Sequence, residues 1–142
     1  MANRIEEMVN VLRDWQGIER QAMNDTAEIM EQTDNKMIRL VMEIIRHDSL
    51  MHHRGQQFLI DSVTKEDVPV RREDVAEIWE KIEAHDEMEK KTIELAEQLH
   101  AKAWSPVHKV LFSYLITDEK KHDTILNELD SIKAGMSQSS GG

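Results

Sequence analysis

The second half of this chain repeats the pattern of the first half when the sequence is shifted by 70 residues. The shift superimposes apolar positions that recur at helical spacing, pairing Ile5 with Val75, Met8 with Ile78, Leu12 with Ile82, Val41 with Leu111 and Leu59 with Leu129. Any two amphipathic helices share a period, so these apolar matches alone are weak support for a repeat. The polar matches carry more weight, and they pair Glu19 with Glu89, Asp48 with Asp118 and His52 with His122. The chain therefore looks like a duplicated helical hairpin.

The apolar periodicity and the residues that interrupt it predict four helices. The segment Thr33-Asp34-Asn35 offers helix-stop and N-cap chemistry after the first periodic run, and a polar stretch followed by Pro69 separates the second run from the third. Ser105 is a suitable N-cap for the fourth run, with Pro106 at the first helical position. The predicted helices span about 4–31, 35–62, 72–103 and 106–134.

The composition favours one all-α domain. The chain has 142 residues, is 39% hydrophobic and 32% charged, and contains only five Gly and two Pro. It is rich in Glu, Lys, Met, Leu and Ile, the residues that lose least on entering a helix. We expect one domain over residues 1–134. The small polar residues 135–142 should form a disordered tail with no catalytic role.

The charge and the absence of cysteine exclude several classes of protein. A formal net charge of -10 would repel nucleic acid and anionic membrane surfaces. No apolar run approaches the roughly 20 residues that cross a bilayer, so we expect a cytoplasmic protein. With no cysteine, the chain offers a metal only oxygen and nitrogen ligands.

Ionisable residues interrupt the apolar stripes at matching heights. Burying an uncompensated carboxylate costs several kcal/mol, so acids on such a stripe must be paired or must bind a cation. Their distances from the helix connections place all of them near one level of the four predicted helices. The candidates are Glu19, Asp48, His52, Glu89, Asp118 and His122. A shared metal site would account for their position.

The sharpest local motif is Glu119-Lys-Lys-His122, whose i, i+3 spacing puts a carboxylate and an imidazole on one helix face. Together with Glu19 and Glu89, this motif resembles the metal-ligand pattern of the ferritin-like superfamily, and within it the rubrerythrin-like proteins without a rubredoxin domain. The resemblance implies a four-helix bundle with a crossover between its second and third helices. It also implies two bound irons.

The second predicted helix departs from the family pattern. Ser49 occupies the position that corresponds to Glu119 in the repeat. The acid that accompanies His52 is Asp48, at i, i+4. The shorter Asp side chain could still reach a metal, the helix could bulge, or one metal could bind tightly and the other poorly. On the fourth helix the family pattern favours Glu119 as ligand, whereas the internal repeat favours Asp118.

Three further residues are candidates for the site, each with a plainer alternative. Asp86, three residues before Glu89, resembles an extra acid of rubrerythrin-like sites but could be solvated. His85 could be a third imidazole or a packed, hydrogen-bonded side chain. Tyr114 could support a ligand through its hydroxyl or could simply lie in the core. A second Glu-x-x-His at residues 97–100 has the phase of a solvated, outward-facing pair.

A carboxylate-rich shell with two imidazoles suits two Fe ions, with Mn as an alternative metal. It implies a reaction with peroxide or dioxygen, as in a rubrerythrin-like peroxidase or in a ferroxidase that handles iron. Because the chain has no cysteine-based relay, electrons would come from a separate donor. A homodimer or larger homo-oligomer is expected. The alternative function is a metal-free helical bundle that serves as a protein-interaction or structural module.

Overall fold

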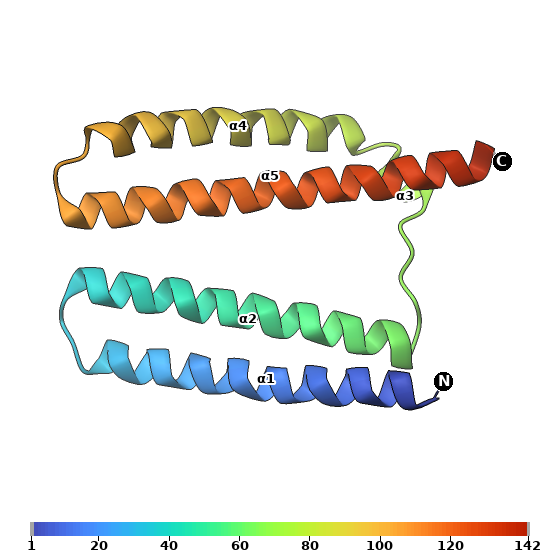
Figure 1. Cartoon of the computed structure of the whole chain (residues 1–142), viewed down its shortest axis with the longest axis horizontal. Helices are drawn as coiled ribbons and strands as arrows, with labels where there is room; N and C mark the ends of the chain where they lie inside the picture. The colour runs from blue at the N-terminus through green and yellow to red at the C-terminus, as the bar shows by residue number, and fades with distance from the viewer. Residues whose placement is uncertain (1, 142) are drawn as a thin grey trace. The chain divides into compact units, whose positions relative to one another are not determined.

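The computed structural model describes the backbone of residues 2–141 and the side chains of residues 3–132, and this part of the chain contains helices and no strands. The all-α prediction is confirmed. The helices, shown in Figure 1, are α1 (Ala2–Glu31), α2 (Lys36–Thr64), α3 (Arg72–Val75), α4 (Trp79–Lys102) and α5 (Pro106–Gly141). The fourth helix was expected to end at about residue 134, but α5 continues to Gly141, so that predicted end is wrong. The side chains of the expected tail at 135–142 lie outside the described residues.

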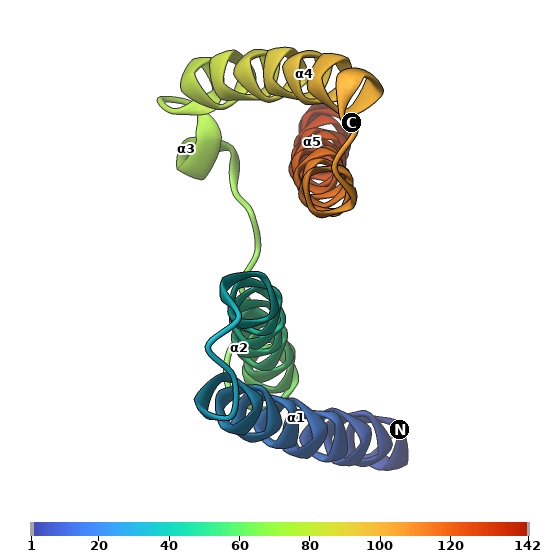
Figure 2. The same cartoon turned by 90° about the vertical axis from the view of Figure 1, so that its left-hand side faces the viewer.

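The chain divides into two compact units, Met1–Val68 and Pro69–Gly142. In the first unit α1 packs along α2, and we call this pair the N-terminal hairpin. In the second unit α4 packs along α5, and we call this pair the C-terminal hairpin; the short α3 also contacts α5. Figure 2 shows the same pairings from a second direction. The single four-helix bundle with its crossover stays a prediction.

The helix starts predicted from capping residues are confirmed. The side chain of Asn35 accepts a hydrogen bond of 3.0 Å from the backbone N–H of Ile38, at the start of α2. At the start of α5, the backbone N–H of His108 donates to Ser105 Oγ at 3.4 Å, with Pro106 as the first helical residue. Both bonds satisfy donors that the first helical turn leaves free.

The predicted third helix is wrong in one respect, because the structure divides it into α3 and α4. The backbone N–H of Ile78 bonds to Val75 O, three residues back, at 3.2 Å. The regular pattern resumes with the bond from Ile82 N to Ile78 O at 3.0 Å. No Pro or Gly marks this tightened turn, so the sequence pattern gave no sign of it. Val75 and Trp79, on either side of the turn, are both buried.

The core of the N-terminal hairpin keeps Leu12 of the predicted stripe on α1 but takes Val9 in place of its neighbour Met8. Val9, Leu12 and Ile60 are buried together, whereas Met8 and Trp15 are 38% and 51% exposed. Adjacent residues on a helix point about 100° apart, so a shift of one position turns Val9 inward and Met8 outward. The apolar period identified the helix correctly, but it did not fix which of the neighbours Met8 and Val9 faces α2.

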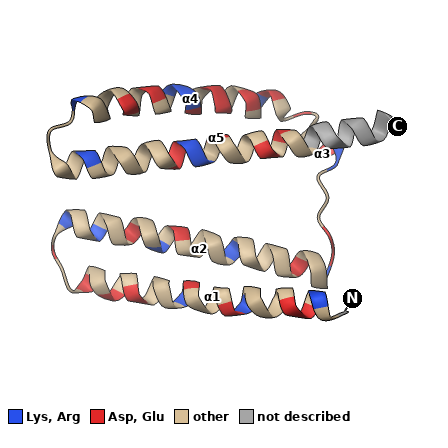
Figure 3. Cartoon of the chain, in the orientation of Figure 1, with Lys and Arg blue, Asp and Glu red and all other residues tan. Residues whose placement is uncertain are grey.

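Charged residues lie along all four long helices, as Figure 3 shows. Asp and Glu outnumber Lys and Arg by 28 to 18 in the whole chain, which gives a net charge of -10. Within the described residues, no helix has the length and apolar character that crossing a membrane requires.

Candidate metal centre

Glu89, Glu119 and His122 come together in the C-terminal hairpin. Glu89 projects from α4, and the other two residues project from one face of α5 at i, i+3. Each of the three side chains offers one ligand atom, and these atoms lie within 4.8 Å of one another. Among the described residues, they form the only group of three or more ligand-type side chains at such distances. We call these three residues the ligand triad.

Glu89 is the buried member of the triad. It is 7% exposed, and its Oε2 atom lies 3.5 Å from His122 Nδ1. Glu119 Oε2 lies 4.0 Å from the same ring nitrogen. Among the described residues, the buried Glu89 Oε2 has no hydrogen-bond partner. A buried acceptor without a hydrogen bond costs free energy. A cation bound beside His122 Nδ1 would give this oxygen a partner.

Asp118 lies on the opposite side of the His122 ring from the triad. Its Oδ2 atom is 3.4 Å from His122 Nε2, and its Oδ1 atom is 3.1 Å from Lys121 Nζ. A carboxylate beside one ring nitrogen orients a histidine so that the other nitrogen can bind a metal. The geometry therefore places Glu119 in the triad and Asp118 behind His122.

His85 contacts the triad through Glu89. Its Nε2 atom lies 2.7 Å from Glu89 Oε1, although the imidazole is 60% exposed. His85 thus pairs with one oxygen of Glu89, and the other oxygen has no hydrogen-bond partner among the described residues. Tyr114 is half-buried on α5, one turn before Asp118, and it is not a member of the triad.

Asp86 pairs with a second acid, Asp123, which sequence reasoning missed. The pKa of Asp86 is raised above its ordinary value, first by its hydrogen bond with Asp123 and then by burial, while Lys90 at 3.7 Å acts in the opposite direction. That hydrogen bond needs one shared proton. When both acids are ionised, the buried Oδ1 atom of each has no donor. Asp123 directly follows His122, but a neighbouring position on a helix faces about 100° away, so adjacency did not predict this contact.

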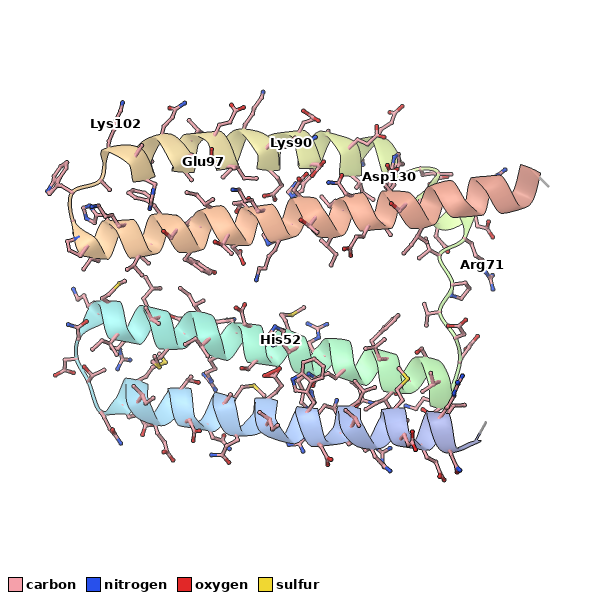
Figure 4. The ribbon with its side chains drawn as sticks, viewed as in Figure 1. His52, Arg71, Lys90, Glu97, Lys102 and Asp130 are labelled. Carbon is pink, nitrogen blue, oxygen red and sulfur yellow. The ribbon has the colours of Figure 1, made fainter. Side chains whose placement is uncertain are left out.

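An open cavity of about 540 Å³ adjoins Asp86 within the C-terminal hairpin. Its lining includes Trp79, Glu83, Leu126 and Asp130. The indole N–H of Trp79 donates to Glu83 Oε1 at 2.7 Å. Figure 4 shows Asp130, one of the lining residues, on α5. The cavity wall is therefore rich in carboxylates close to Asp86.

The N-terminal hairpin carries a pair where the C-terminal hairpin carries a triad. His52 Nδ1 lies 2.9 Å from the buried Glu19 Oε2, and Figure 4 shows His52 on α2. Ser49, three residues before His52, is only 5% exposed and occupies the place that Glu119 has on α5. Asp48 is half-buried, and within the described residues no ion pair joins it to His52.

Two buried amides in the same hairpin were also missed from the sequence. Gln16 Nε2 donates to Gln57 Oε1 at 3.1 Å and to the carbonyl oxygen of His53 at 3.3 Å. Gln56 is 3% exposed, and neither its Nε2 nor its Oε1 atom has a hydrogen-bond partner among the described residues. Its place four residues before Ile60, on the core stripe of α2, was the available signal.

The second Glu-x-x-His lies apart from the triad. Glu97 is 53% exposed and pairs with Lys120 of α5 at 3.4 Å. His100 is half-buried, with Nε2 3.2 Å from Ser113 Oγ. The pair was expected to be solvated and to face outward; Glu97 is exposed, His100 is half-buried, and neither residue joins the triad.

No protein-family model matches this chain, and the searches of curated proteins and of solved structures also gave no match. The candidate site therefore stands on its own geometry. Of the predicted ligands, the structure brings Glu89, Glu119 and His122 together and pairs Glu19 with His52. Their convergence on one centre stays a prediction.

Proposed function

We propose that this chain is a ferritin-like carboxylate and histidine protein that binds iron and reacts with peroxide or dioxygen. The observation that carries the proposal is the ligand triad, in which the buried Glu89 Oε2 has no hydrogen-bond partner and lies 3.5 Å from His122 Nδ1. A cation between these atoms would balance the carboxylates and occupy the free acceptor.

The types of ligand support iron over softer metals. Carboxylate oxygens and imidazole nitrogens suit Fe and Mn, and the chain has no thiolate to offer. In the proposed bundle, the crossover between α2 and α4 would bring the N-terminal hairpin against the triad. Glu19 and His52 would then complete a centre for two metal ions.

Iron held at this centre would supply electron transfer toward dioxygen or peroxide. The protein residues would bind the ions, orient His122 through Asp118 and provide negative charge that favours the ferric state. A separate donor would supply electrons, because the chain has no cysteine for a built-in relay. Assembly into a homodimer or larger homo-oligomer is part of the same proposal.

A metal-free interaction module is the second candidate, and two contacts favour it. His52 Nδ1 lies 2.9 Å from Glu19, and His85 Nε2 lies 2.7 Å from Glu89. These imidazoles give both buried carboxylates a partner without any metal. On this account, substitutions at the triad would alter stability alone.

Elemental analysis of the full chain, reconstituted with iron and freed of loosely bound metal, separates the two functions. The test variant is Glu119→Ala/His122→Ala. The matched control is Glu97→Ala/His100→Ala, which removes the same two residue types at the same i, i+3 spacing outside the triad.

The proposed function predicts bound iron in the wild type and in the control, and loss of iron in the triad variant. Iron-loaded wild type should also consume peroxide or dioxygen. A folded wild type that retains no metal, or a triad variant that binds as much iron as the control, would favour the interaction module.

A further inference from the structure

We infer that the two hairpins bind metal with unequal strength, and that Ser49 sets this inequality. The triad of the C-terminal hairpin holds one ion tightly, while the N-terminal hairpin holds a second ion weakly and exchanges it. This inference rests on the proposed function, because it concerns the same centre. It goes further by naming the residue that controls the second position.

The C-terminal hairpin is prepared for a metal before one binds. His122 Nδ1 lies 3.5 Å from Glu89 Oε2 and 4.0 Å from Glu119 Oε2, and neither contact is a hydrogen bond. The nitrogen and the two oxygens can therefore close around an ion without breaking a hydrogen bond to one another. Asp118, 3.4 Å from His122 Nε2, holds the ring from its other side.

Among its described residues, the N-terminal hairpin has neither ligand atoms that are free of hydrogen bonds to one another nor an acid that holds the histidine ring from its other side. His52 Nδ1 is already bonded to Glu19 Oε2 at 2.9 Å, so a metal must break that contact. Ser49 is 5% exposed and brings a short, neutral hydroxyl to the position where Glu119 brings a carboxylate. Within the described residues, Asp48 has no ion pair with His52 that would match the one between Asp118 and His122.

The inequality has a functional consequence. An ion held by fewer charged ligands leaves more easily, so the N-terminal position would pass metal ions in and out. The ion at that position would be cargo, whereas the ion at the triad would be resident. This division favours a metal-handling role over a reaction that needs two permanently bound ions.

A titration of the metal-free full chain with Mn²⁺ in competition with a chelator tests the inference. The wild type should bind one ion tightly and a second ion weakly. Ser49→Glu adds the missing carboxylate and should strengthen the weak step at least about tenfold, the lower end of what even an outer partner of a ligand contributes. Ser49→Ala, the matched control, adds no carboxylate and should not strengthen the weak step.

Glu119→Ser is the reciprocal variant, and it decides the question even if Ser49→Glu fails to fold. It should abolish the tight step and leave only weak binding. Equal affinity for two ions in the wild type, an unchanged weak step in folded Ser49→Glu, or a retained tight step in Glu119→Ser would overturn the inference. A wild type that binds no Mn²⁺ and no iron would instead overturn the proposed function.

Discussion

The two hairpins share a pattern of sequence but treat their buried carboxylates differently. In the N-terminal hairpin, Glu19 is bonded directly to His52 at 2.9 Å. In the C-terminal hairpin, Glu89 gives one oxygen to His85 at 2.7 Å and leaves the other buried without a hydrogen-bond partner. The repeat therefore preserves the positions of the polar groups, while the contacts at those positions have diverged.

The same divergence is visible at other paired positions. Ser49 corresponds to Glu119, and the unpaired amide of Gln56 corresponds to the apolar Leu126. The N-terminal hairpin thus buries neutral polar groups where the C-terminal hairpin has an acid or a hydrocarbon. Under the proposed function, the C-terminal hairpin would therefore hold the metal ion more tightly than the N-terminal hairpin.

The largest expected effect comes from neutralising the buried acid of each hairpin in turn. Glu89→Gln should lower the affinity for the tightly bound metal ion by at least about 100-fold. The reason is that it removes a ligand itself, and not only a residue that contacts a ligand. Glu19→Gln, at the paired position, should affect only the weak ion. Calorimetric titration with Mn²⁺ measures both. A tight step that is lost in Glu19→Gln and kept in Glu89→Gln would reverse the comparison.

Neutralising Asp118 and its counterpart in the repeat, Asp48, should have the next largest effect. Asp118→Asn should lower the affinity of the tight site about 10- to 100-fold, because Asp118 orients His122. Asp48→Asn should leave that step unchanged. Competition with a chelator gives both affinities.

Exchanging the core residues at one paired position should alter stability. Gln56→Leu removes a buried amide that has no hydrogen-bond partner, and should raise the free energy of unfolding by about 1 to 3 kcal/mol. The reciprocal Leu126→Gln should destabilise the protein. Denaturant unfolding of the metal-free protein measures both changes. A destabilised Gln56→Leu would mean that this amide has a partner in solution.

The smallest effect concerns the acid pair of the C-terminal hairpin. The pKa of Asp86 is raised in the folded state by its hydrogen bond with Asp123, so the stability that its protonated form contributes is lost as pH rises above the ordinary value of 3.8. In the metal-free protein, Asp86→Asn should therefore raise Tm slightly at pH 7 and leave it unchanged below pH 3.8. Thermal melts of the wild type and of Asp86→Asn between these pH values measure the change in Tm. A lower Tm at pH 7 would contradict it.

The sequence predicted the helices and their caps well, because those features depend on local chemistry. Asn35 and Ser105 cap the helices that they were expected to cap. The Glu-x-x-His spacing of Glu119 and His122 placed both residues on one face, and the level of Glu89 brought it opposite them. These inferences needed only helical geometry and distance along the chain.

Features that depend on the exact rotation of one helix against its neighbour were missed. Val9 and not Met8 faces α2, and Asp123 pairs with Asp86 although it stands next to a triad member. A period locates an apolar stripe only to within about one residue, and one residue changes the direction of a side chain by about 100°. The tightened turn at Ile78 was missed because no Pro or Gly marks it.

A diffraction experiment on iron-loaded crystals at the iron absorption edge tests the central claim most directly. The account predicts a strong anomalous peak in contact with Glu89, Glu119 and the Nδ1 atom of His122, with a weaker peak beside Glu19 and His52. An iron peak away from the triad, or no peak in crystals soaked with excess ferrous iron, would contradict it.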